Sequence, residues 1–128
     1  MITYVTVGME HEICGYSAPP WLPGHMKAFW RSRSLENSHG AVLAYDGEKL
    51  IGFFRYNNGP RKAMYAYGTY VLPKYRSRGV AIKLWKRALR KEKPKHIHVF
   101  TTSTGGRKLV EALGKKLTKY KWIVTNFD

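Results

Sequence analysis

The chain has 128 residues, 44% of them hydrophobic and 14% aromatic, which is enough for one folded domain with its own core. Its 23 Lys and Arg residues against eight Asp and Glu residues give a formal net charge of +15. No apolar run approaches the ~20 residues of a membrane helix, and no signal peptide opens the chain, so we expect no membrane association and a cytoplasmic protein.

The first half of the chain predicts a strand, a helix and a hairpin, in that order. Residues 2–7 alternate in polarity as a strand does, and a helix is expected over about 24–35, after a proline-rich loop. The hairpin has its strands at 41–45 and 50–56, because Asp46-Gly47 between them is a strong turn signal.

The second half predicts strands that alternate with basic helices. The elements expected after a turn at Asn57–Pro60 are a strand at 63–72, a helix from Ala81 that ends before Pro94, a strand at 96–102, a helix at 106–117 and a strand at 120–124. Strands separated by a helix favour parallel pairing, whereas hairpins supply antiparallel pairs. We therefore expect an α/β (α+β) fold in one domain over residues 1–128, with a mixed, mostly antiparallel central sheet flanked by helices.

The most informative pattern is a basic turn between the strand at 63–72 and the helix that follows it. Gly79 can adopt a positive φ and lets a ligand approach the backbone, and Ala81 keeps the first helical turn slim. Arg76 and Arg78 supply positive charge nearby. Because N–H groups and the helix dipole also favour an anion, the turn predicts a diphosphate-binding site. The alternative is a solvated basic loop.

The R-x-x-G-x-A pattern at Arg76–Ala81, preceded by Val71-x-Pro73, resembles the acyl-CoA-binding motif of the GCN5-related N-acetyltransferases, the GNAT family. The resemblance is tight over about 63–91 and topological elsewhere. It implies the acyl-CoA N-acyltransferase fold, acetyl-CoA as the acetyl donor, and direct transfer of the acetyl group to an amine. The cofactor-binding residues that it implies are Val71, Leu72, Arg76, Ser77, Arg78, Gly79, Val80, Ala81, Ser103 and Thr104, with the Val71 and Leu72 contacts made by backbone groups.

The resemblance also suggests where catalytic groups would lie. Family members often carry Glu or His on the fourth strand, at positions that are Tyr67 and Tyr65 here, four and six residues before Val71 and on its face of the expected strand. These tyrosines could pass protons through water, hold the acceptor, or pack in the sheet. His98 on the next strand is the third candidate. The tyrosine that often donates a proton from the last helix is replaced by Val110.

The positive charge belongs to the second half of the chain. Residues 74–121 hold sixteen of the 23 Lys and Arg residues and only two carboxylates, Glu92 and Glu111. A bound CoA carries too few charges to balance this, so we expect a polyanionic acceptor or partner, such as nucleic acid or an acidic macromolecule. A solubilising basic surface is the alternative.

A second function class therefore stays open, in which a catalytically weak or inactive GNAT-fold module binds nucleic acid or a partner macromolecule. Its support is the basic half and four aromatic residues that could stack on bases: Trp21, Trp30, Tyr56 and Tyr75. No metal site is expected, because Cys14 is the only cysteine and no carboxylate cluster accompanies His96 and His98. Either a monomer or a homodimer is compatible with the sequence.

Overall fold

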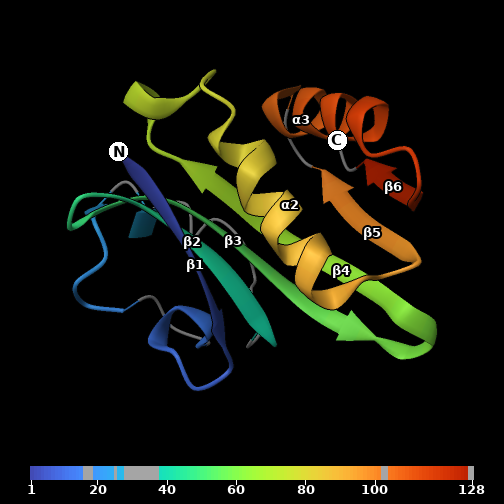
Figure 1. Ribbon diagram of the computed structural model, residues 1–128, viewed down its shortest axis with the longest axis horizontal. Coiled ribbons are helices and arrows are strands. Elements are labelled where there is room, and N and C mark those ends of the chain that lie inside the picture. The colour runs from blue at the N-terminus through green and yellow to red at the C-terminus, as the bar shows by residue number, and fades with distance from the viewer. Residues whose placement is uncertain (16–18, 25, 28–37, 102–103, 127–128) are drawn as a thin grey trace.

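The computed structural model describes residues 1–126 apart from 16–18, 25, 28–37 and 102–103. The described chain forms one six-stranded sheet, in the order β1-β2-β3-β4-β5-β6, with two helices packed on it (Figure 1). The strands are β1 (Ile2–Gly8), β2 (Gly40–Asp46), β3 (Lys49–Gly59), β4 (Ala63–Val71), β5 (His96–Thr101) and β6 (Lys121–Asn126), and the helices are α2 (Val80–Glu92) and α3 (Thr104–Lys116).

The sheet is mixed, as the sequence predicts. Strands β1, β2, β3 and β4 pair antiparallel with one another in that order. Strands β4, β5 and β6 are parallel, because α2 and α3 return the chain to the same edge of the sheet each time. Of the helix expected over 24–35, Gly24, Met26 and Lys27 are helical, and the remainder lies outside the described residues.

The turn expected at Asn57–Pro60 is in a different place. Strand β3 runs on to Gly59, and the chain reverses in the short 3-10 turn Pro60–Lys62. Two asparagines stay extended because His39 holds them: its backbone N–H donates to Asn57 Oδ1, and its Nδ1 accepts from the backbone N–H of Asn58. These bonds outweigh the turn preference of the Asn-Asn-Gly sequence.

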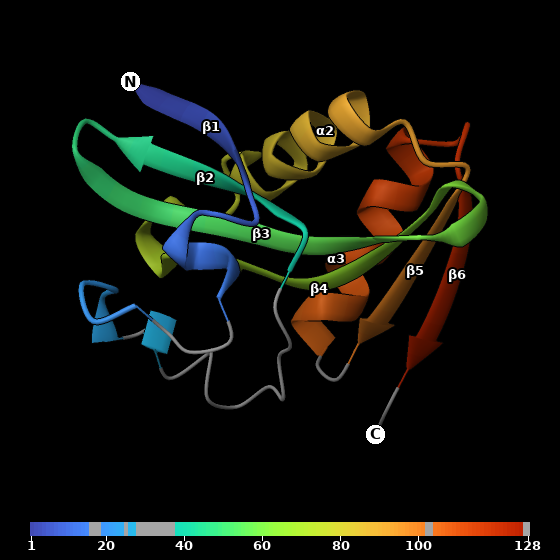
Figure 2. The same cartoon turned by 90° about the horizontal axis from the view of Figure 1, so that it is seen from below.

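Helix α2 packs on one face of the sheet, and the N-terminal segment, by which we mean the described residues between β1 and β2, lies on the other (Figure 2). The apolar side chains at helical spacing, which predict a buried stripe on α2, are buried at Leu84, Trp85, Ala88 and Leu89 and half-buried at Ala81. Trp85 stacks on Phe54 of β3, with ring centroids 4.2 Å apart, and its Nε1 donates to Thr69 Oγ1 of β4 at 2.8 Å. Helix α2 is thereby fixed against β3 and β4, just below the point where β4 ends.

The opposite face of β3 holds a buried cation beside the N-terminal segment. Arg55 is fully buried, and its guanidinium donates to the carbonyl oxygen of Gly15 at 2.9 Å. Burial lowers the pKa of Arg55 to about 10, against the opposing effect of the ionisable groups of Cys14 and Tyr67. Burial also raises the pKa of the Cys14 thiol, which disfavours a role for this residue as a nucleophile.

A buried tyrosine joins β3 to the end of α2. The hydroxyl of Tyr56 donates to Glu92 Oε2 at 2.7 Å, and Asn58 Nδ2 donates to the other oxygen of the same carboxylate at 3.1 Å. Burial, and then the bond to Glu92, raise the pKa of the Tyr56 phenol far above its ordinary value. The folded protein therefore holds this proton more tightly than the unfolded chain does.

We expect Tyr56→Phe to lower the free energy of unfolding at neutral pH by about 1.5–3 kcal/mol, because a buried hydrogen bond to a charged group is lost. The stability of the native protein should also fall as pH rises above about 10, where only the unfolded chain loses the phenol proton. The variant should fall less steeply there. The lowered pKa of Arg55 makes the free energy of unfolding rise with pH in this range, but this effect is the same in the native protein and in the variant. Urea unfolding at several alkaline pH values measures both effects.

Tyr45→Phe is the matched control for this prediction. Tyr45 lies on the neighbouring strand and is half-buried, and its hydroxyl contacts no carboxylate among the described residues. Tyr45→Phe should therefore change the free energy of unfolding, and its decrease at alkaline pH, less than Tyr56→Phe does. Identical alkaline slopes for the native protein and Tyr56→Phe would contradict the assignment.

Candidate functional site

A gap opens between β4 and β5 at their carboxyl ends. The two strands pair only from Ala63–His96 to Ala66–Val99, although β4 continues to Val71 and β5 to Thr101. Opposite β3, Arg55 pairs with Gly68 and Tyr56 with Ala66, which leaves Tyr67 as an extra residue in β4. An extra residue bends a strand, and beyond it β4 and β5 diverge (Figure 1).

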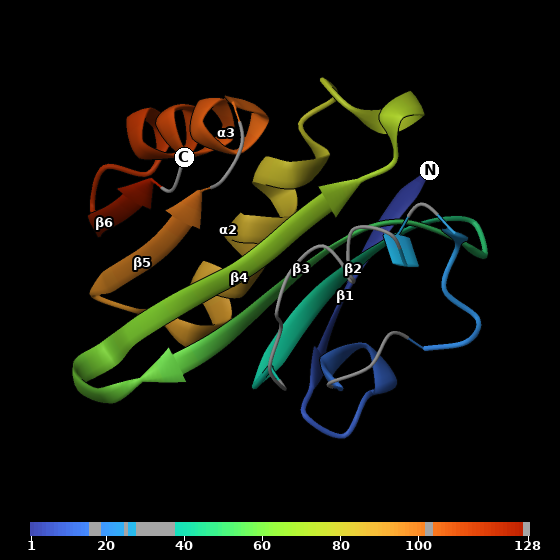
Figure 3. The ribbon, with the colours of Figure 1, turned by 180° about the vertical axis from the view of Figure 1, so that it is seen from behind.

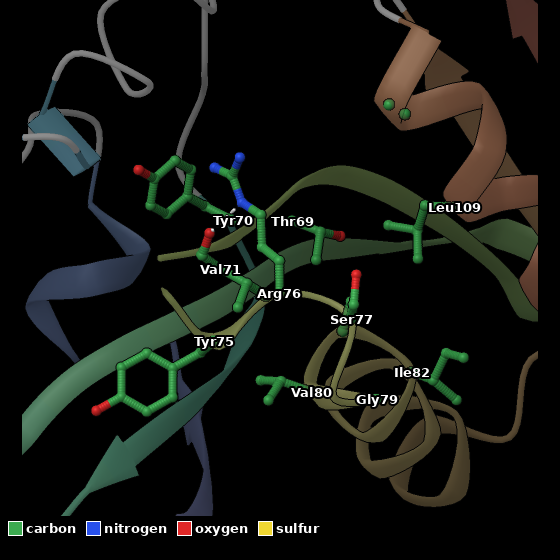
Figure 4. A pocket seen from close by; sticks show the side chains of 13 residues that line it. Thr69, Tyr70, Val71, Tyr75, Arg76, Ser77, Gly79, Val80, Ile82 and Leu109 are labelled. Carbon is green, nitrogen blue, oxygen red and sulfur yellow. Dashed lines mark hydrogen bonds between the residues drawn. The ribbon is translucent and has the colours of Figure 1, made fainter. Parts of the chain in front are cut away.

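A pocket of about 550 Å³ lies at this gap (Figure 4). Its walls are residues 69–71 of β4, 75–77 of the following turn, 79–82 at the start of α2, and Gly105, Gly106 and Leu109 of α3. The pocket therefore faces the N-terminal ends of two helices, and both helix dipoles place partial positive charge on it. Most of the predicted cofactor residues are brought together here.

The first turn of α2 has unpaired backbone N–H groups at the edge of the pocket. Gly79 has φ +78° and provides no side-chain cap to the helix. The backbone N–H of Lys83 is the one that donates back to Gly79 O, so the N–H groups of residues 80–82 have no acceptor within the helix. A Cβ atom at Gly79 would meet nothing within 4 Å, so the space beside Gly79 is open. This geometry fits the phosphate-binding role predicted for the turn.

The three side chains before Gly79 differ in their relation to the pocket. Arg76 lines it, but its Nε donates to Val71 O at 2.8 Å and its guanidinium lies over the Tyr70 ring, as Figure 4 shows. Ser77 also lines it and has φ +63°. The guanidinium of Arg78 lies over the Tyr75 ring, 5.4 Å from its centroid, and Arg78 is outside the lining.

The backbone of Val71 faces the gap, whereas that of Leu72 does not. The Leu72 N–H donates to Ile51 O at 2.9 Å, and its carbonyl accepts from the backbone N–H of Tyr75 at 2.8 Å. Both backbone groups of Leu72 are therefore hydrogen-bonded within the protein, and its contact with the cofactor stays a prediction. Antiparallel pairs alternate, and Val71 stands opposite Gly52, so its N–H points away from β3 toward the open side.

The candidate catalytic tyrosines are not on the face of β4 that was expected. Thr69 receives a hydrogen bond from Trp85 of α2, and Val71 shares its face. Because Tyr67 is an extra residue, the alternation of side chains between the two faces reverses at the residues that precede it. Ala66 therefore faces α2. Tyr65 and Tyr67 consequently lie on the opposite face. Sequence spacing alone missed this reversal.

That opposite face brings the three candidates together on two adjacent strands. The rings of Tyr65 and His98 stack, with centroids 4.8 Å apart. Asn57 Nδ2 of β3 donates to Tyr67 Oη at 2.7 Å. In Figure 3, β4 and β5 present this face to the viewer, and both helices lie behind them. The Tyr67 oxygen is thus an acceptor, and its own hydrogen remains free to be donated.

Two parts of the site were missed at the sequence level. Asn57 was assigned to a turn, although it orients Tyr67. The pair Gly105-Gly106 at the start of α3, which the sequence does display, lines the pocket and leaves room beside the helix terminus. Of the other predicted contacts, Ser103 lies outside the described residues, and Thr104 begins α3, with its side chain outside them as well.

Two findings limit other kinds of site. Within the described residues, no group of three or more His, Cys, Asp or Glu side chains is placed to hold a metal ion. None of the helices in the described part of the chain has the length and apolar character needed to cross a membrane.

Comparisons with known proteins agree with this geometry. The model of the acetyltransferase (GNAT) family matches residues 7–115. No curated protein sequence matches this chain. Among solved structures, a GNAT-family acetyltransferase from Streptococcus pneumoniae TIGR4 is 24% identical, with a TM-score of 0.60, and the match covers 89% of this chain and 86% of that one.

Two further solved structures have the same fold. An aminoglycoside N-acetyltransferase, AAC(6')-Iy, in complex with CoA is 19% identical, with a TM-score of 0.62 and coverage of 88% of this chain and 90% of that one. A ribosomal-protein-alanine N-acetyltransferase from Brucella melitensis biovar Abortus 2308 is 16% identical, with a TM-score of 0.59 and coverage of 88% and 91%. At these identities the likeness is one of fold.

Proposed function

This chain belongs to the GNAT acetyltransferase family, and on that premise we propose that it is an acetyl-CoA-dependent N-acetyltransferase that acts on an amine. The observation that carries the proposal is the open anion site at Gly79, at the head of a pocket between diverging strands. A CoA thioester would supply an activated acetyl group and a thiolate leaving group there. The residues of this chain then have to bind, orient and move protons.

Binding is assigned to backbone groups and to the pocket wall. The free N–H groups of residues 80–82 would hold the diphosphate, with the α2 dipole behind them. Arg76 and Ser77, at the pocket edge, would add side-chain donors, and Arg78 would add charge from outside. The free N–H of Val71 would lie beside the acetyl carbonyl and stabilise negative charge that develops on its oxygen.

Proton transfer is assigned to the opposite face of β4. Tyr67 lies at the point where β4 leaves β5, and Asn57 fixes its oxygen as an acceptor. Its hydroxyl hydrogen can therefore be given to the departing thiolate and replaced from the attacking amine. Tyr65 and His98, stacked on each other beside it, would form the wall against which the amine is held. The basic half of the chain suits an acceptor that is, or is bound to, a polyanion.

Acetyl-CoA should raise the melting temperature of the native protein, because a ligand that binds only the folded state stabilises it. S-acetylpantetheine, which has the thioester but no diphosphate, should give a much smaller shift at the same concentration. Thermal melts with each compound measure this. Equal shifts would remove the anion site from the proposal, and no shift with either compound would remove the function.

A second candidate is a GNAT-fold binding module without turnover. Val110, which replaces the tyrosine expected from the family resemblance, is buried and has no proton to give. For this candidate, acetyl-CoA would raise the melting temperature, but no thiol would be released with any amine offered. A thiol-release assay over a panel of polyamines, aminoglycosides and basic peptides separates the two.

A further inference from the structure

Six exposed basic side chains gather at the edge of the sheet where β4, β5 and β6 begin. We call this surface the basic end, and its members are Arg61, Lys62, Lys93, Lys95, Lys119 and Lys121. They come from three segments that are far apart in the sequence. In Figure 1 these segments lie along the right side, and in Figure 3 they lie along the left side.

Backbone hydrogen bonds hold three of these lysines side by side. The N–H of Lys95 donates to Lys62 O at 2.8 Å, and the N–H of Lys121 donates to Lys95 O at 3.0 Å. Neighbouring strands lie about 4.8 Å apart, so the three residues form a row roughly 10 Å wide. The pocket is at the other ends of these strands, separated from the row by about the length of α2, roughly 20 Å.

The charge of the basic end is not balanced by nearby carboxylates. Glu92 is the acidic residue of α2, and both of its oxygens accept hydrogen bonds from Tyr56 and Asn58 of β3. Within the described part of the chain, none of the six cations forms an ion pair with a carboxylate. Each cation therefore repels the other five, a cost that a partner with closely spaced negative charge would remove.

Three of the six cations occupy backbone positions where other residues are usual. Arg61 and Lys62 have φ values of 58° and 62° in the turn between β3 and β4, where Asn-Gly is the common pair. Lys93 has φ 51° after the last turn of α2, where Gly is common. A left-handed conformation costs a residue with a Cβ about 1–2 kcal/mol. Charge is thus present where conformational preference favours small residues.

We propose that the basic end binds the phosphate backbone of a nucleic-acid duplex. Long basic side chains in a row can reach successive phosphates without reading bases. A membrane surface is disfavoured, because none of the large apolar side chains exposed in the described chain belongs to the basic end.

Stacking on single-stranded bases is also disfavoured. Tyr56 and Tyr75, expected as stacking residues, are buried, and Trp30 lies outside the described residues. Trp21 is exposed, but it belongs to the N-terminal segment and donates to Glu12. The duplex would be the polyanionic partner in the proposed function, and this inference rests on that function only in this respect. Binding of the duplex requires no acetyl transfer.

The test measures binding of the full chain to a 20-base-pair duplex, as RNA and as DNA, over a range of salt concentrations. For six contacts, the logarithm of the association constant should fall with the logarithm of salt concentration with a slope of about −5. The variant Lys62→Gln, Lys95→Gln, Lys121→Gln should reduce this slope by about 3 and weaken binding about 100-fold at 0.1 M salt. Its acetyl-CoA melting shift should be that of the native protein.

The matched control removes the same charge elsewhere, with Lys49→Gln, Lys83→Gln and Lys108→Gln, all exposed. It should lose only a few-fold in affinity. Equal losses in the two variants, a salt slope near zero, or tighter binding to a single strand or to vesicles with anionic lipid would each overturn the proposal. Duplex binding without an acetyl-CoA shift would leave the basic end in place and remove the transferase function instead.

Discussion

Gly79→Glu should abolish the stabilisation of the protein by acetyl-CoA. At about 100 times its Kd, a ligand adds about 2.7 kcal/mol to the free energy of unfolding, which for a chain of this size raises the melting temperature by about 10 °C. The substitution places a carboxylate in the open space before the free N–H groups of residues 80–82. Because this negative charge occupies the anion site and repels a diphosphate, the shift should fall to nearly zero, and kcat/KM should fall with it.

Gly47→Glu is the matched control, because Gly47 also has a positive φ but does not line the pocket. Gly47 lies in the β2–β3 turn with φ +61°, and a Cβ there would also meet nothing within 4 Å. Both variants should lose about 1–2 kcal/mol of stability from the left-handed backbone. Only Gly79→Glu should lose the acetyl-CoA shift. A normal shift in that variant would place the diphosphate elsewhere.

The geometry of the turn at Gly79 could be predicted from the sequence because it depends on local order. A strand, a basic turn with Gly79 and the start of a helix are contiguous in the chain, so a short pattern specifies which backbone N–H groups begin the helix. The apolar stripe of α2 was predictable for the same reason, since helical periodicity is local. The hydrogen bond from the Leu72 N–H to Ile51 could not be predicted in this way, because Ile51 lies on another strand.

The face of β4 on which the candidate catalytic residues lie could not be predicted from spacing. One unpaired residue, Tyr67, reverses the alternation of β4, and nothing in the sequence marks the position of such a residue. Asn57 and Asn58 have turn preferences, yet bonds to His39, eighteen and nineteen positions away, hold them in β3. The basic end is likewise assembled by strand pairing, so the sequence predicted its charge but not its location.

Tyr67→Phe should lower kcat by about 100-fold and leave the acetyl-CoA melting shift unchanged. Removal of a positioned proton donor typically costs a factor of 10²–10⁴ in rate. The ring of the phenylalanine keeps the place of Tyr67 at the mouth of the gap, so the pocket on the other face of β4 should be intact. Rates at saturating acetyl-CoA and saturating amine, measured by thiol release, give kcat directly.

The neighbouring residues separate proton transfer from acceptor binding. Tyr65→Phe keeps the ring that stacks on His98, and the Tyr65 hydroxyl has no hydrogen-bond partner among the described residues, so kcat should change little. His98→Ala removes the stacked wall and should raise KM for the amine more than it lowers kcat. If Tyr67→Phe instead raises KM at constant kcat, then Tyr67 holds the acceptor and the proton must travel by another route. Because Val110 has no proton to give, that route would run through Tyr65, through His98 or through solvent in the gap between β4 and β5.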